Sequence, residues 1–325
     1  MLSARRPRRA AFVGCLASAT LLALSVLGPS TEAGQLPFVH APLLFGTAAP
    51  TEANLAAQEQ IAGRALIAVR EYRLWDSHLF GPDQLWMRDT FHTLFLSIKP
   101  VRTNGTVIPY AAIASATPGT PVYQDMLNIA AQLNAYGTRI FLTFSHEPEA
   151  SPAYGTPAQF AAAFRNFVTV MRSQAVNAVY VAIFTGYGFT RTDASNVSYY
   201  YPGDGYVDDV GVDAYNWAGC RTSAWKPLAL LIEGARVWGL GHPSVHLILT
   251  EWGSDEDPAV PGRKAQWISD AAALLTQPAY VQFAGTISWG AGTASSPCSF
   301  NYATSASSTA AWQAMGHAPA YSAGE

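Results

Sequence analysis

Two stretches of the sequence, FLTFSHEPE at residues 141–149 and LILTEWGS at residues 247–254, decide the class of fold. Each is an apolar run that ends on a carboxylate, Glu147 in the first and Glu251 in the second. A strand rich in Leu, Ile and Phe without polar alternation is typical of a parallel sheet that is covered on both faces. In a closed barrel of such strands, functional groups follow the carboxyl ends of the strands. The two glutamates are therefore predicted to lie at one end of a barrel.

The rest of the chain alternates between strand-like and helix-like segments. The predicted strands cover 42–48, 65–72, 93–100, 139–147, 178–188, 206–217, 246–253 and 285–292. Predicted helices cover 52–65, 121–136, 227–238, 262–275 and 310–315, and one more opens at Pro157 with Thr156 as its N-cap. Eight such alternations favour an α/β fold of the closed (β/α)8, or TIM-barrel, type with a single domain. No G-x-G-x-x-G fingerprint of a dinucleotide fold follows the first strand.

The start of the chain has the pattern of a secretory signal peptide. A basic stretch precedes an apolar run at about 10–27, and small residues follow as far as Ala33. We therefore expect 1–33 to be removed and 34–325 to form one secreted domain, about the size of a (β/α)8 barrel. A transmembrane anchor is the alternative, although the run is short and contains Ser, Gly and Thr.

Composition limits the expected partners. The formal net charge is −3 with 13% charged residues and no basic stripe, so nucleic acid is not an expected partner. Beyond the leader no run is long enough to span a membrane, so we expect no stable membrane association and a monomeric protein. Aromatic residues make up 12% of the chain, which suits an oligosaccharide or polysaccharide substrate whose sugar faces pack on flat rings.

Two cysteines, Cys220 and Cys298, lie beyond the predicted leader. They occur in YNWAGC (215–220) and SWGAGTASSPC (288–298), each after a predicted strand, so both are expected in loops at the same end of the barrel. An even number of cysteines in an exported protein favours a disulfide. Two free buried thiols are the alternative.

Glutamates at the ends of two strands suit glycoside hydrolysis, in which one carboxyl group donates a proton and the other attacks the sugar carbon. Glu149 shares its side of an extended segment with Glu147 and is the competing proton donor. The zinc motif H-E-x-x-H needs a histidine where Ala150 stands, and no G-x-S-x-G serine elbow occurs. The alternatives are a non-catalytic carbohydrate-binding barrel and a secreted hydrolase of another class.

Four strand-end motifs resemble those of glycoside hydrolase family 26, a family of (β/α)8 retaining glycosidases in clan A that is best known for β-mannanases. The motifs are His-Glu at 146–147, YPGDGYVDDVGVDAY at 201–215, Glu-Trp-Gly at 251–253 and a tryptophan at 289. The resemblance covers about residues 42–289. It implies a retaining hydrolase that cleaves β-linked polysaccharide by double displacement and needs no metal or cofactor.

The resemblance also implies a role for each matching residue. Glu147 corresponds to the acid/base of the family, and Glu251 corresponds to its nucleophile. His146 corresponds to a residue that positions the sugar and the second carboxylate. Tyr215 corresponds to the tyrosine that hydrogen-bonds the nucleophile, and Trp289 corresponds to the aromatic platform under the sugar ring.

The segment after the acid/base glutamate departs from the mannanases of that family. PEASPAYGT (148–156) has Tyr154 as its only ring, where those mannanases have a Trp-rich segment. β-Mannan, β-glucan and xylan are therefore all candidate substrates. Trp217, at the end of another predicted strand, and Trp252, next to Glu251, are further candidates for sugar contacts.

Four other residues near the predicted site are given no catalytic role. Asp213 is expected to be a buried, hydrogen-bonded group in the barrel mouth. Asp204 is expected to stabilise a Pro-Gly-Asp turn. Arg70 and Trp75 lie near the second predicted strand, and neither is predicted to act in the site.

Overall fold

The computed structural model describes residues 42–222, 224–290 and 298–321. The predicted leader at 1–33 and the last two residues of the predicted eighth strand lie outside these ranges. Within them, no helix combines the length and the apolar character needed to cross a membrane.

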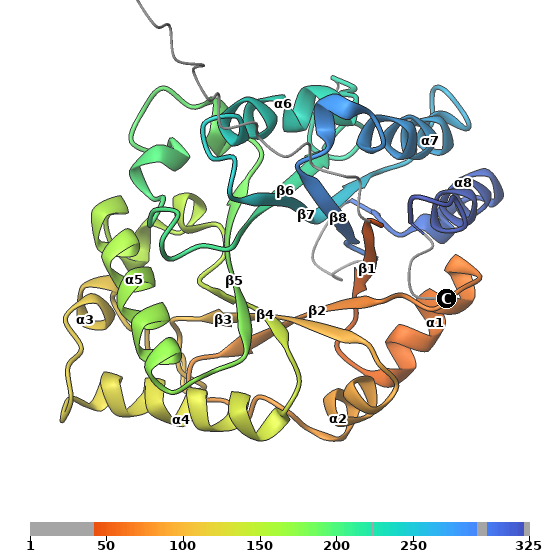
Figure 1. The fold of residues 1–325 in the computed structure, drawn as a ribbon. Coiled ribbons are helices and arrows are strands. Elements are labelled where there is room, and N and C mark those ends of the chain that lie inside the picture. The colour runs from red at the N-terminus through yellow and green to blue at the C-terminus, as the bar shows by residue number, and fades with distance from the viewer. Residues whose placement is uncertain (1–41, 223, 291–297, 322–325) are drawn as a thin grey trace, which may run out of the picture. The chain divides into compact units, whose positions relative to one another are not determined.

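Eight parallel strands close into a barrel in chain order, with the helices around it (Figure 1). The strands are β1 Leu44–Ala48, β2 Ala68–Leu74, β3 Thr93–Lys99, β4 Ile140–Phe144, β5 Ala178–Thr185, β6 Asp209–Asn216, β7 His246–Ser254 and β8 Phe283–Ser288. The predicted (β/α)8 fold is confirmed. The second strand begins three residues later than predicted, because helix α1 ends at Ala62 and Gly63 then turns the chain with a φ of 71°.

The described helices are α1 Glu52–Ala62, α2 Pro82–Asp89, α3 Tyr110–Ala114, α4 Pro121–Tyr136, α5 Pro157–Ser173, α6 Leu228–Gly239, α7 Arg263–Leu275 and α8 Ala306–Gly316. Thr156 caps α5 as predicted, because its side chain accepts a hydrogen bond from the Gln159 N–H. Helices α2 and α3 were not predicted. With eight and five residues they are too short to show a clear apolar period.

The core has an outer and an inner part. The larger, outer cluster packs the outward faces of the strands against the helices. The inner cluster fills the barrel with Ala68, Phe95, Val179, Val181, Ile183, Ile248 and Ile287. The barrel is therefore solid, and the inner cluster forms a floor below the carboxyl ends of the strands.

A β-bulge in β7 sets the direction of the side chains at its carboxyl end. Val212 of β6 pairs with Leu249, but the next residue of β6, Asp213, pairs with Glu251. Thr250 is the extra residue, and its hydroxyl donates a 2.5 Å hydrogen bond to Asp213 Oδ1. Thr250 and Glu251 thus both face the barrel interior, although consecutive strand residues normally face opposite sides.

Candidate active site

Three carboxyl groups meet at the carboxyl end of the barrel. Glu147 follows β4, Asp213 lies in β6 and Glu251 lies in β7. One carboxylate oxygen from each lies within 4.8 Å of the others. The structure therefore brings together the two glutamates singled out in the sequence, with a third acid beside them.

Glu251 is held by three donors. The Tyr215 hydroxyl donates to Oε2 at 2.7 Å, which is the predicted tyrosine hydrogen bond. The Tyr72 hydroxyl donates to Oε1 at 2.6 Å, and Arg70 Nη1 lies 3.1 Å from the same oxygen. Burial, together with the negative charge of Glu251, raises the pKa of both phenols well above the usual value, so the phenols remain donors. Three donors around one carboxylate fix its orientation.

Arg70 reaches across the barrel from β2 to the opposite strands. Its Nη1 donates to Asp213 Oδ1 at 3.2 Å and to the Thr250 carbonyl oxygen at 2.7 Å. Burial opposes the Arg70 charge, but Tyr72, Asp213 and Glu251 outweigh it and hold the pKa of Arg70 above its usual value. Burial and then the Glu251 charge raise the pKa of Asp213 well above its usual value.

The Arg70 guanidinium occupies the place that a metal ion would take beside the carboxylates. The spacing of Glu147, Asp213 and Glu251 could suit a cation, but Arg70 already supplies a positive charge to two of the three. The other described cluster with metal-ligand spacing contains Cys220, Cys298 and Asp255, and there the two sulfurs are bonded to each other. Neither cluster offers a full set of free ligands.

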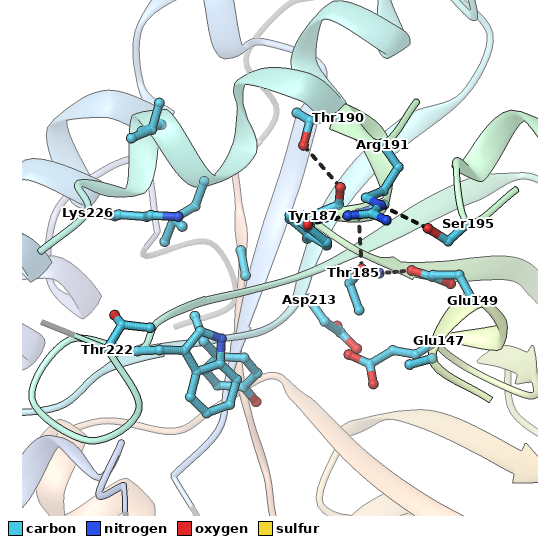
Figure 2. Close-up of a pocket in the computed structure, with 18 of the residues that line it drawn as sticks. Glu147, Glu149, Thr185, Tyr187, Thr190, Arg191, Ser195, Asp213, Thr222 and Lys226 are labelled. Carbon is cyan, nitrogen blue, oxygen red and sulfur yellow. Dashed lines mark hydrogen bonds between the residues drawn. The ribbon is translucent and has the colours of Figure 1, made fainter. Parts of the chain in front are cut away.

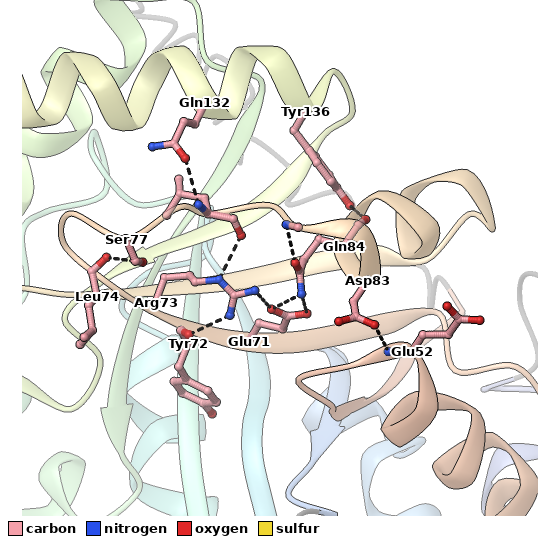
Figure 3. Close-up of polar contacts among 12 residues, drawn as sticks. Glu52, Glu71, Tyr72, Arg73, Leu74, Ser77, Asp83, Gln84, Gln132 and Tyr136 are labelled. Atoms are coloured by element: carbon pink, nitrogen blue, oxygen red, sulfur yellow. Dashed lines mark hydrogen bonds and ion pairs between the residues drawn. The ribbon is translucent and has the colours of Figure 1, made fainter. Parts of the chain in front are cut away.

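Arg70 and Tyr72 are site residues that the sequence analysis missed. They alternate with Glu71 and Arg73 along β2, and Figure 3 shows Tyr72 on the side of the strand away from these two. Glu71 points outward, where its carboxylate accepts hydrogen bonds from Gln84 Nε2 at 2.8 and 3.0 Å and pairs with Arg73. The signal was present, because an arginine and a tyrosine two residues apart share one face of a strand.

Glu147 stands on a bend with unusual backbone geometry. Glu147 and Ser145 both have a φ of 49°, in the left-handed region that non-glycine residues seldom adopt. Such residues store about 1–3 kcal/mol each and cluster at functional sites. The bend is fixed by the Glu147 N–H, which donates to the Ile183 carbonyl oxygen at 2.9 Å, and by the 2.7 Å contact between the Ser145 and Tyr110 hydroxyls.

The electrostatic environment of Glu147 favours its protonated form. Burial, followed by the charges of Glu251 and Glu149, raises its pKa to about 7. Arg70 and Lys99 oppose this shift but do not cancel it. At neutral pH one glutamate of the pair is thus suited to donate a proton, while the other is surrounded by donors.

His146 directly precedes Glu147 in the sequence, is half-buried and is not hydrogen-bonded to either catalytic glutamate. Its ring packs edge-on against Tyr72 with the centroids 5.2 Å apart. Burial, and then the charges of Arg70 and Lys99, lower its pKa well below the usual value, so the ring is neutral. Its Nδ1 has no hydrogen-bond partner among the described residues. The predicted positioning role stays a prediction.

Two of the predicted sugar-contact residues lie at the site. Trp289 is half-buried, and its ring lies edge-on to Tyr72 with the centroids 5.5 Å apart. Trp217 is half-buried beside Tyr215, with a centroid distance of 5.0 Å, and lines the cavity described below.

The assignment of Trp252 as a sugar contact is wrong. Trp252 follows the inward-facing Glu251, so it faces outward, where it is 0% exposed and packs against Trp267, Tyr302 and Trp312. The substrate-contact prediction for Tyr154 also gains no support. That ring is half-buried, packs edge-on against Tyr110 and does not line the cavity.

Trp75, Asp204 and the two cysteines lie outside the group of carboxylates. Trp75 lies in the outer core and donates from Nε1 to Asp125 Oδ2 at 3.1 Å. Asp204 accepts 2.8 Å hydrogen bonds from the Tyr201 hydroxyl and from His242, which fits the structural role predicted for it. The predicted disulfide between Cys220 and Cys298 is confirmed, with a Cα–Cα distance of 5.1 Å.

A cavity of about 720 Å³ opens beside the carboxylates (Figure 2). Glu147 and Asp213 line one end, and the wall continues past Thr185 and Tyr187 towards Lys226. Its lining comes from the segment after β4, from the carboxyl ends of β5 and β6 with the segments that follow them, and from α6.

Comparisons with known proteins agree with this architecture. The catalytic domain of a family 26 endo-β-1,4-mannanase from Bacillus sp. JAMB-750 superposes with a TM-score of 0.63, at 12% identity over 86% of each chain. A modular endo-β-1,4-mannanase from Cellulomonas fimi gives a TM-score of 0.62, at 19% identity over 86% of this chain and 71% of that one. The chain shares the fold of these two family 26 enzymes, which belong to the family that the strand-end motifs resemble.

The sequence comparisons are sparser. No family model matches the chain. Endoglucanase H of Acetivibrio thermocellus is 25% identical over 237 residues, which are 68% of this chain and 25% of that protein. The chain therefore spans about a quarter of the length of this curated relative.

Proposed function

We propose that this protein is a retaining glycoside hydrolase of family 26 that cleaves β-linked polysaccharide. The observation that carries the proposal is the meeting of Glu147 and Glu251 at the barrel end, with carboxylate oxygens within 4.8 Å. Retaining enzymes hold their two carboxyl groups about 5–5.5 Å apart, whereas inverting enzymes need about 6.5–9.5 Å to admit a water molecule. The short separation supports retention.

In the first step, Glu251 attacks the anomeric carbon and forms an ester bond as the glycosidic C–O bond breaks. Glu147 gives its proton to the departing oxygen, which leaves as the hydroxyl of the shortened chain. The donors on Glu251, Tyr72 and Tyr215, orient its carboxylate for attack. A neutral His146 adds no positive charge beside Glu147 that would favour loss of its proton.

In the second step, water attacks the same carbon and the ester bond to Glu251 breaks. Glu147, now ionised, takes a proton from that water. Ester formation removes the charge of Glu251, which had raised the pKa of Glu147, so the pKa falls and the carboxylate becomes a suitable base. The cycle returns both glutamates to their first state and consumes one water.

The candidate sugars follow from the comparisons. The structural neighbours include mannanases and the curated relative is named an endoglucanase, so β-mannan and β-glucan are the first candidates, with xylan the third. The leader pattern and the Cys220–Cys298 disulfide support an extracellular enzyme.

The function is tested by measuring the release of reducing sugar from β-mannan, mixed-linkage β-glucan, cellulose and xylan. Carbohydrate binding without release from any polymer would favour a non-catalytic barrel instead.

Hydrolysis is expected to decline as the pH rises above about 7. Glu147 must carry its proton in the first step, and above its pKa of about 7 the protonated fraction falls about tenfold per pH unit. The profile of kcat/KM against pH for an oligosaccharide measures this limb. A dinitrophenyl glycoside, whose leaving group needs no proton, serves as the control. Its rate of hydrolysis should fall much less as the pH rises. A rate on the oligosaccharide that stays constant to pH 9 would contradict the assignment of Glu147.

A further inference from the structure

We infer that the cavity beside Glu147 binds the departing part of the sugar chain, and that the exposed ring of Tyr187 is a platform for a leaving-group sugar. This inference rests on the proposed function and goes beyond it, because it assigns one side of the site to one half of the substrate.

The lining of the cavity gives its direction. Glu147 lines it, whereas Glu251, Tyr72 and Trp289 do not. In the proposed reaction, Glu147 meets the oxygen of the leaving group and Glu251 meets the anomeric carbon of the sugar that stays behind. A cavity on the Glu147 side therefore receives the leaving group.

The cavity wall carries the aromatic ring of Tyr187, whose apolar surface is exposed to water. The Tyr187 side chain lies at the carboxyl end of β5 and is 66% exposed, although it lines the cavity. Flat rings of this kind pack against the C–H faces of sugars while the hydroxyl end stays polar. A volume of about 720 Å³ lies well within the range for ligand pockets and exceeds what a single sugar ring needs.

Tyr187 is held in place before any ligand binds. The Arg191 guanidinium lies 4.9 Å from the ring centroid and also donates a hydrogen bond to the Tyr187 hydroxyl. Asp193 pairs with Arg191 and fixes the guanidinium in turn. The Thr190 hydroxyl donates to the Tyr187 carbonyl oxygen at 3.1 Å. The contact with Arg191 covers one side of the ring, and a preorganised ring loses little entropy on binding.

A buried polar atom on the same wall lacks a partner. Glu149 Oε1 accepts a 2.5 Å hydrogen bond from the Thr185 N–H, but Oε2 has no donor within the described part of the chain. Buried carboxylate oxygens are normally satisfied, so an unsatisfied one beside a cavity is a reason to expect a ligand hydroxyl there. Figure 2 shows Glu149 next to Thr185 on this wall.

The test compares two substrates in the same variants. One is a β-1,4-linked hexasaccharide of glucose or mannose, which has sugars on the leaving side. The other is the 4-nitrophenyl glycoside of the matching trisaccharide, whose leaving group is a single small ring. We expect Tyr187→Ala to lower kcat/KM for the hexasaccharide about 10- to 100-fold and to change the nitrophenyl rate less than about threefold. Tyr187→Phe, which keeps the ring, should retain most of the activity.

Tyr199→Ala is the matched control, because Tyr199 is 58% exposed and does not line the cavity. It should affect neither substrate. Equal losses on both substrates in Tyr187→Ala, or no loss on the hexasaccharide, would overturn the assignment of the cavity while leaving the proposed function intact. A wild-type protein that cleaves neither substrate would instead refute the proposed function, and this inference with it.

Discussion

Replacing Glu251 by alanine is expected to reduce the rate of polysaccharide hydrolysis by about 10⁴-fold or more. This loss corresponds to an increase of at least about 5 kcal/mol in the activation free energy. Glu251 is the only protein nucleophile in the proposed mechanism, and the ester intermediate cannot form without it. The variant should still fold, although Arg70 and two phenols lose a partner. Steady-state rates on the best polysaccharide of the panel measure the loss.

Rescue by azide distinguishes a missing nucleophile from a damaged fold. In Glu251→Ala, azide can enter the vacated space and attack an aryl glycoside to give a glycosyl azide of inverted configuration.

Glu71→Gln is the matched control, because Glu71 is also a buried glutamate but points away from the site on β2. It should keep kcat within about twofold. Near-normal hydrolysis by Glu251→Ala without azide would refute the assignment.

Replacing Arg70 by methionine should produce the largest loss of stability among single substitutions at the site. Its removal leaves the buried carboxylates of Asp213 and Glu251 without their cation. Breaking a buried ion pair in this way costs about 3–5 kcal/mol. Glu251 also loses a donor, which should lower kcat by about 100-fold. Urea unfolding gives the change in the free energy of unfolding, and rates on the same preparation give the change in kcat.

The double variant Arg70→Met/Asp213→Asn separates the two effects. Removing the ionisable carboxyl group of Asp213, one of the two groups left without the guanidinium, should recover part of the lost free energy of unfolding. It should not restore kcat, because Glu251 still lacks its arginine. An Arg70→Met protein as stable as wild type would contradict the ion-pair network described here.

The architecture and the two glutamates were predictable because their signals are local. The apolar residues at 247–249 predict a buried strand, and the carboxylate two residues further on is expected at the end of the barrel where functional groups gather. Arg70 and Tyr72 were harder, because their role depends on which face of β2 points inward. The apolar spacing of 65–72 also fits a continuing helix, so the face could not be assigned.

The environment of Glu251 shows what one sequence cannot provide. The bulge at Thr250 is a property of how β7 pairs with β6, and nothing in the composition of the segment marks it. The assignment of Trp252 failed for a simpler reason. It was placed by its closeness to Glu251 in sequence, although neighbouring strand residues point to opposite faces.

The anomeric configuration of the first product tests the central claim most directly. Proton NMR recorded from the start of hydrolysis of a β-linked oligosaccharide shows which anomer appears at the new reducing end before mutarotation. Carboxylates as close as those of Glu147 and Glu251 predict the β-anomer first, with the α-anomer growing in later. If the α-anomer appears first, water attacks the sugar directly and the covalent role of Glu251 is wrong.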